Sequence, residues 1–171
     1  MYVLYSKVHD RVPSVTRGDL GYNTCTMIYV AADKQGFQAI QFVEAYLKDH
    51  NLSFENVGVK REDEDIKLED MIPPFAEKVR STDGNLGILS CGTGVGVEVG
   101  VNKFAGIRAC LVTDPKIAEW SKVYDNCNVL CLVGWETTKE IIYKILDAWF
   151  AAQYDGDKGR LKMMEVFDTW H

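Results

Sequence analysis

Short apolar runs alternate with stretches of helical periodicity along most of this chain. Apolar residues recur at helical spacing over 37–47, for example, directly after such a run. The runs themselves are predicted to be buried strands of a parallel sheet. They cover residues 27–32, 54–59, 86–90, 107–112 and 129–133. This alternation predicts a single α/β domain, a three-layer, doubly wound (Rossmann-like) five-stranded parallel sheet.

Local signals suggest where several helices begin. Residues 60–70 are rich in charge and are expected to be a solvated loop, after which Pro73-Pro74 leads into a short helix through Val79. Asp114-Pro115 combines a capping carboxylate with proline at the first turn. Thr137-x-x-Glu140 resembles a capping box for the next helix. A last helix is expected over 160–170.

Composition and charge narrow the class of protein. The mixed, polar residues 1–25 are expected to be an N-terminal extension, and residues 26–171 the domain. A net charge of −6 without a basic stripe argues against nucleic acid or an anionic membrane as partner. We find neither an apolar run of the ~20 residues that a membrane span needs nor the apolar core of a signal peptide. A cytoplasmic protein is therefore expected.

The cysteines do not suggest a disulfide framework or a zinc site. Their number is odd, no two form a Cys-x-x-Cys pair, and several lie in or beside apolar runs. They are Cys25, Cys91, Cys110, Cys127 and Cys131. Reduced thiols and no metal are the expectation.

Two loops at the carboxyl ends of predicted strands carry candidate chemistry. One is 31–36 and the other is Cys91-Gly-Thr-Gly-Val-Gly96, where glycines alternate and can turn their amides toward an anion. A helix start beyond the second loop would add partial positive charge beside the Cys91 thiol. A dinucleotide motif does not fit, because it needs glycine where Val97 stands, and a cysteine-phosphatase motif would need arginine there. A Walker motif does not fit either, because Gly-Lys-Ser/Thr is absent. A purely structural turn beside an inert buried thiol is the alternative.

The cysteine loop and several later motifs resemble one family. Residues 87–96, continued by Asn102-Lys-Phe-Ala-Gly-Ile-Arg108, are similar to type B ribose-5-phosphate isomerases and galactose-6-phosphate isomerase subunits. Further similar stretches follow in the same order at residues 73–79, 128–130 and 147–156. The resemblance covers roughly residues 27–165.

The resemblance implies an aldose–ketose isomerase for a small sugar phosphate that works without metal or cofactor. Cys91 would move a proton between C1 and C2 through an enediolate, and Thr93 would assist ring opening or proton relay. The amides of Gly92, Gly94 and Gly96 would hold the enediolate oxygen. Asp33 would bind a sugar hydroxyl. Family members form at least dimers with active sites between subunits, so a homodimer or homotetramer is expected.

Several positions depart from the family pattern. Lys34 and Tyr124 stand where histidines are usual, and Trp135 aligns with an arginine that contacts phosphate in some members. By the same resemblance, Asp125 and Asn126, which follow Tyr124, would be further substrate contacts. Lys158 and Lys162, with Arg160 between them, replace two phosphate-binding arginines and would hold phosphate as point charges.

These departures leave the substrate open. Tyrosine, with an ordinary pKa of about 10, is a poor ring-opening acid. A four-carbon sugar phosphate, which needs no ring opening, is therefore an alternative to ribose 5-phosphate or a hexose phosphate. A weakly catalytic, sugar-phosphate-binding partner subunit and a flavodoxin-like binding module are further alternatives.

Overall fold

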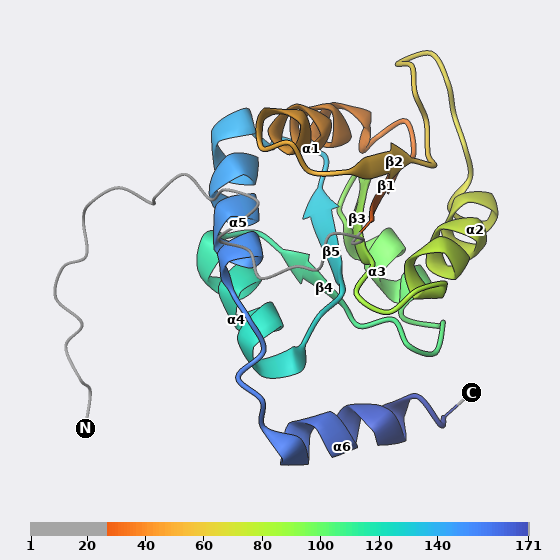
Figure 1. Cartoon of the computed structure of the whole chain (residues 1–171). Helices are drawn as coiled ribbons and strands as arrows, with labels where there is room; N and C mark the ends of the chain where they lie inside the picture. Colours follow the sequence, from red (N-terminus) through yellow and green to blue (C-terminus); the bar gives the residue numbers. More distant parts are fainter. Residues whose placement is uncertain (1–26, 171) are drawn as a thin grey trace, which may run out of the picture.

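One parallel sheet forms the centre of the computed structural model, which describes residues 27–170 (Figure 1). Its strands lie in the order β2-β1-β3-β5-β4, and all pairs are parallel. The strands are β1 (Ile28–Ala32), β2 (Phe54–Asn56), β3 (Leu86–Cys91), β4 (Ala109–Val112) and β5 (Val129–Val133). The predicted extension over 1–25 lies outside the described residues.

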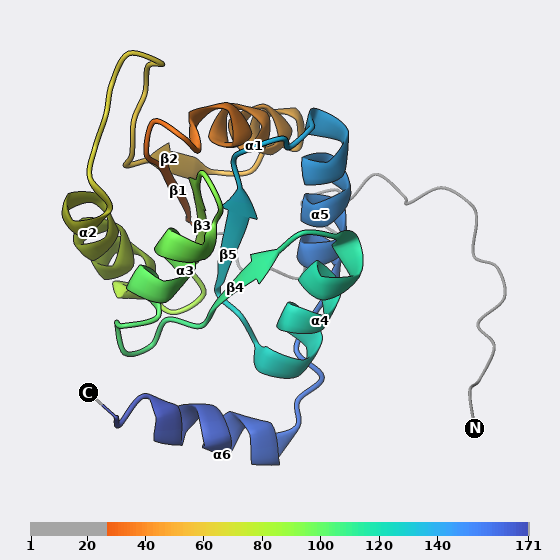
Figure 2. The ribbon, with the colours of Figure 1, turned by 180° about the vertical axis from the view of Figure 1, so that it is seen from behind.

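Helices cover both faces of the sheet, which confirms the three-layer, doubly wound architecture. One face carries α1 (Phe37–Asp49), α4 (Pro115–Asp125) and α5 (Lys139–Ala151). The other carries α2 (Leu68–Arg80) and α3 (Val95–Val101). Figures 1 and 2 show α6 (Lys158–Phe167) apart from these layers, beyond the amino ends of the strands. None of the helices within residues 27–170 is long and apolar enough to cross a membrane.

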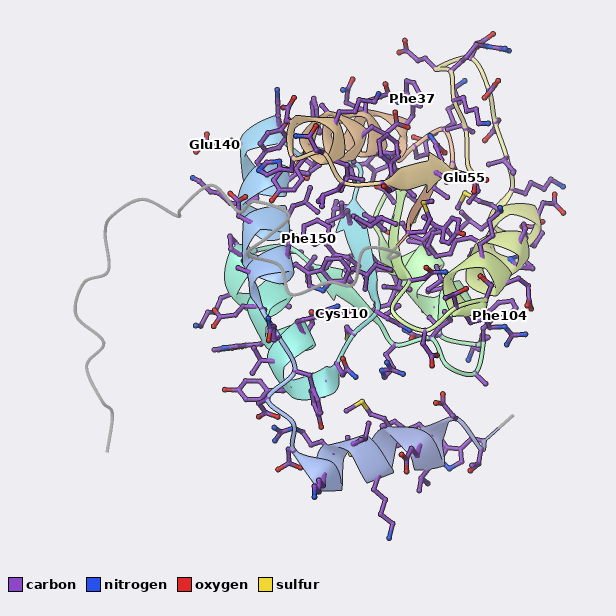
Figure 3. All side chains as sticks on the ribbon, viewed as in Figure 1. Phe37, Glu55, Phe104, Cys110, Glu140 and Phe150 are labelled. Atoms are coloured by element: carbon purple, nitrogen blue, oxygen red, sulfur yellow. The ribbon has the colours of Figure 1, made fainter. Side chains whose placement is uncertain are left out.

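The core lies between each helix layer and the sheet. Every residue of β3 is buried, as expected for a central strand covered on both faces. Phe150 of α5 points into the first layer, where Figure 3 shows it between helix and sheet. Phe75 of α2 fills the second layer and lies so close to Gly87 that a methyl group there would be 2.5 Å from its ring.

The start of α2 differs from the sequence prediction. The helix begins at Leu68, within the stretch expected to be a loop, and Pro73 and Pro74 lie inside it rather than ahead of it. Proline removes a backbone donor there. Burial of the apolar face outweighs that loss, because five of its side chains lie in the core, namely Met71, Ile72, Phe75, Ala76 and Val79.

Capping follows the sequence signals in part. The Asp114 carboxylate accepts from the amides of Lys116 at 2.8 Å and Ile117 at 3.1 Å, which confirms the predicted start of α4. The capping box at Thr137 was wrong by one residue. Thr138 caps α5 by accepting from the Ile141 amide at 3.3 Å.

Candidate active site

The loop after β1 lies directly against the end of β3. A methyl group on Gly36 would lie 2.4 Å from the carbonyl of Ser90 and 2.9 Å from the amide nitrogen of Cys91, so only glycine fits. The Gly36 amide donates to the Asp33 carboxylate at 2.9 Å and closes the turn. From β1 the chain proceeds to β2 on one side of the sheet, and from β3 it proceeds to β4 and β5 on the other side. The carboxyl ends of β1 and β3 therefore form the topological switch point of the sheet.

The loop after β5 joins the same junction. Gly134 donates its amide to the Cys91 carbonyl at 2.9 Å, and Trp135 donates its amide to the Gly92 carbonyl at 3.0 Å. The Trp135 indole reaches the loop after β1, where its Nε1 donates to Oε1 of Gln35 at 3.1 Å. Three loops that are distant in sequence therefore interlock around Cys91 and Gly92.

The Cys91 side chain points into the layer of α2 and α3. It is the last residue of β3, only 5% exposed, and packs in the cluster that includes Met71 and Val97. A methyl group on Gly96 would lie 3.7 Å from its Sγ, so the sulfur lies beside the first turn of α3. A thiol so placed is shielded from bulk water while it remains next to the glycine loop.

The other predicted residues of this half of the site lie in the glycine loop and in the loop after β1. Gly94 has a φ of +75°, a conformation that favours glycine, and it is the N-cap residue of α3. Thr93 is exposed, and its Oγ1 accepts from the Val95 amide at 3.3 Å. Asp33 is partly buried, which raises the pKa of its carboxyl, while amides of the same turn oppose the rise. Lys34 is exposed beside it.

The remaining predicted residues lie at the opposite end of the sheet. Helix α4 starts at the carboxyl end of β4 and ends at Asp125, near the amino end of β5 (Figures 1 and 2). Tyr124 is 45% exposed there, with the Arg160 guanidinium 5.3 Å from its ring centroid. Lys158 and Lys162 are exposed on α6. Within one chain the structure brings neither these residues nor Asn126 to Cys91.

Sequence reasoning missed a buried lysine near this second group. Lys122 lines a cavity of about 490 Å³, together with Arg108 and Asn126. Its Nζ donates to the Cys127 carbonyl at 3.0 Å and lies 4.4 Å from the Trp149 ring centroid. Burial lowers the pKa of this ammonium to about 8. The sequence around Lys122 is that of an ordinary polar helix and does not indicate that this lysine is buried.

Gln35 and Gly134 were also missed, because their roles depend on contacts between loops rather than on a local pattern. No group of three or more His, Cys, Asp or Glu residues that could hold a metal ion gathers within residues 27–170.

These features define an α/β protein with a doubly wound parallel sheet, in which a glycine loop and a cysteine lie at the switch point, the place where proteins of this class hold small molecules. The particular family follows from comparison. The Ribose/Galactose Isomerase family model matches residues 28–165. The chain belongs to this family.

Individual relatives agree with that assignment. The probable ribose-5-phosphate isomerase B of Mycoplasma pneumoniae is 35% identical over 131 residues, 77% of this chain and 86% of that one. The D-erythrulose-4-phosphate isomerase 2 of Mycolicibacterium smegmatis is 29% identical over 130 residues, 75% and 86% of the two chains. The structure of ribose-5-phosphate isomerase B from Mycoplasma genitalium with bound ribulose-5-phosphate is similar at a TM-score of 0.77. It is 31% identical, and the match covers 85% of this chain and 96% of that one.

Proposed function

We propose that this chain is an aldose–ketose isomerase that interconverts the two forms of a small sugar phosphate, with Cys91 as its base. The supporting observation is the junction of three loops around Cys91 at the switch point of the sheet. Membership of the isomerase family gives that junction its chemistry, and a relative of the same fold has been solved with ribulose 5-phosphate bound.

The reaction needs one carbon-bound proton to move between neighbouring carbons. In the aldose-to-ketose direction, the Cys91 thiolate takes the proton from C2 and later returns it to C1. The C2 hydroxyl proton passes to the oxygen on C1, a transfer that the exposed Thr93 hydroxyl assists. Amides of the Gly92–Gly96 loop stabilise the negative charge of the enediolate between the two steps. The burial of Cys91 strengthens these electrostatic interactions by excluding water.

A second copy of the chain completes the site in this proposal. The partner would supply the predicted residues that lie at the opposite end of their own sheet from Cys91. They are Tyr124, Asp125, Asn126, Lys158 and Lys162. Apolar side chains exposed on α3, on α6 and just after α6 support an interface between copies. They include Val95, Val99, Val166, Phe167 and Trp170. A homodimer or a homotetramer built from such dimers fits this arrangement.

Ribose 5-phosphate and ribulose 5-phosphate are the first substrate candidates, because the relative from Mycoplasma pneumoniae carries that activity in its name. Tyr124 favours a second candidate, a tetrulose phosphate that needs no acid to open a ring. The similarity to D-erythrulose-4-phosphate isomerase 2 supports it. Each substrate is a small metabolite, consistent with a cytoplasmic enzyme.

An activity panel tests this function. The chain is incubated in D₂O with erythrulose 4-phosphate, ribose 5-phosphate and galactose 6-phosphate, and nuclear magnetic resonance follows the interconversion and the deuterium that enters at C1 or C2. Turnover of at least one substrate with deuterium incorporation is expected. Binding of sugar phosphate without turnover would instead support the weakly catalytic partner subunit.

A further inference from the structure

Trp135 covers the residue that directly follows the proposed base. The indole lies across Gly92, where an added methyl group would be 2.5 Å from its Cε2 and 2.6 Å from its Cζ2. Although large and apolar, Trp135 is 54% exposed. An aromatic ring that is half open to solvent at the edge of a site offers a wall for the apolar part of a ligand.

Hydrogen bonds fix the direction of this ring. The indole Nε1 donates to Gln35 at 3.1 Å, and the backbone amide of Trp135 donates to the Gly92 carbonyl at 3.0 Å. The next residue, Glu136, has a φ of +55°, which is uncommon for a side chain of this kind. Such backbone strain persists only where surrounding contacts impose it. The ring is therefore held across Gly92 by its hydrogen bond to Gln35 and by the backbone hydrogen bond of Trp135.

The same ring borders empty space. Trp135 lines a cavity of about 270 Å³ with Thr113, Val133 and Thr137, at the carboxyl ends of β4 and β5. This volume exceeds that of the one or two extra carbons that separate a hexose phosphate from a pentose or tetrose phosphate. The indole therefore both contacts Gly92 and borders this cavity, and a smaller side chain at position 135 would open room beside Gly92.

We propose that Trp135 is a specificity-determining residue that admits four- and five-carbon sugar phosphates and rejects six-carbon ones. This inference rests on the proposed isomerase function. Gln35 is the positioning residue that holds the ring in the rejecting orientation.

The test compares kcat/KM for ribose 5-phosphate and galactose 6-phosphate in the unaltered chain and in Trp135→Ala, Trp135→Phe and Trp120→Ala. Trp120 is the matched control, because it is also exposed but lies on α4, with Lys116 Nζ 5.3 Å from its ring centroid. Trp135→Ala should raise the six-to-five-carbon ratio about ten- to 200-fold, the range for one methylene in an apolar pocket. Trp135→Phe should raise it less, and Trp120→Ala should leave it unchanged.

Gln35→Met keeps the length of the side chain and removes its acceptor. Its ratio should move in the same direction as that of Trp135→Ala, through a lower KM for galactose 6-phosphate with kcat for ribose 5-phosphate preserved. Melting curves followed by circular dichroism establish that each variant is folded.

The outcomes separate the two proposals. An unaltered chain that isomerises sugar phosphates, with a ratio unmoved in folded Trp135→Ala, would overturn the role of Trp135 alone. A preference of the unaltered chain for galactose 6-phosphate would overturn it as well. Absence of turnover with the whole panel would overturn the isomerase proposal and this inference together.

Discussion

Gly134 donates its amide to the carbonyl oxygen of Cys91 at 2.9 Å, one residue beyond the register pair that Cys91 makes with Val133. A methyl group on Gly134 would lie 2.8 Å from that same carbonyl oxygen. It would also lie 2.5 Å from the carbonyl of Gln35 and 2.8 Å from Cα of Gly36. All three are backbone atoms, so no side-chain rotation relieves the contact. The loops after β1, β3 and β5 can meet because position 134 carries no side chain.

Gly134→Ala should separate these loops. We expect the free energy of unfolding to fall by about 1–3 kcal/mol, the usual cost of overpacking. Turnover should fall about a hundredfold, because a displacement near 1 Å at a reacting group has that effect. Urea unfolding and kcat with ribose 5-phosphate measure the two.

Gly159→Ala is the matched control for stability. Gly159 lies in α6, and the nearest atom to its added methyl group is the side-chain Oδ1 of Asp157 at 3.2 Å. Alanine is the better helix former there, so stability should be unchanged or slightly higher. Equal unfolding free energies for Gly134→Ala and the unaltered chain would show that the loops after β1, β3 and β5 accept the methyl group without loss of stability.

Cys91→Ala should remove the proton transfer and retain the fold. Loss of a general base reduces turnover by about a hundredfold to ten-thousandfold. Deuterium incorporation into ribose 5-phosphate in D₂O should fall by the same factor, because both report removal of the carbon-bound proton. Cys110→Ala is the control, since Cys110 lies half-buried on the edge strand β4 (Figure 3). Turnover by Cys91→Ala near that of Cys110→Ala would exclude Cys91 as the base.

The sequence was sufficient to predict the three central strands because they are mostly buried. β5 has the predicted bounds of 129–133, and β3 extends the predicted run by one residue to Cys91. The start of α2 was wrong because proline was treated as a helix start. The five buried side chains of α2 outweigh that local signal. Tertiary burial of this kind is invisible to a rule that considers neighbours in sequence alone.

The site was predictable where its signal is local. The glycines of 92–96 mark a loop that approaches a ligand, and the family resemblance supplied the role of Cys91. Gln35 and Gly134 carried no such signal. Gln35 matters through its contact with Trp135, 100 positions away. Gly134 matters through its contacts with Cys91, about forty positions away, and with the loop after β1. Contacts of that separation follow from strand order, which the sequence did not specify.

Two inactive chains should restore activity when they are mixed, if each site combines two subunits. Cys91→Ala lacks the base, and the double variant Lys158→Met, Lys162→Met lacks the cations expected to hold phosphate. Each lost phosphate contact weakens binding about ten- to a hundredfold. After unfolding and refolding together in equal amounts, about a quarter of all sites in randomly paired dimers would be intact. The measurement is kcat/KM with ribose 5-phosphate well below KM.

A mixture of Cys91→Ala with Thr93→Ala is the control for this experiment. Both residues belong to the same half of the site, so every mixed dimer carries a defect in each of its sites. No recovery is expected in this mixture. Recovery in neither mixture would show that the C-terminal lysines do not serve the active site of the partner subunit.

Lys122 should make stability depend on pH in the alkaline range. Burial lowers its pKa from 10.5 to about 8, so between these values the unfolded chain binds more protons than the folded one. Stability therefore rises with pH through this window and the penalty is fully present below pH 8. The shift corresponds to about 3 kcal/mol. The measured quantity is the unfolding free energy of the unaltered chain minus that of Lys122→Met. We expect this difference to rise by up to that amount between pH 7 and pH 10.5.

Urea unfolding at intervals across this range measures the gain, because groups common to both proteins cancel in the difference. Lys116→Met is the control, since Lys116 is exposed on the same helix and its Nζ pairs with Glu119 at 3.0 Å. Its difference from the unaltered chain should stay flat with pH, because the charge of an exposed lysine costs nearly the same in both states. A flat difference for Lys122→Met as well would mean that water reaches the Lys122 ammonium and that its burial against Trp149 does not persist in solution.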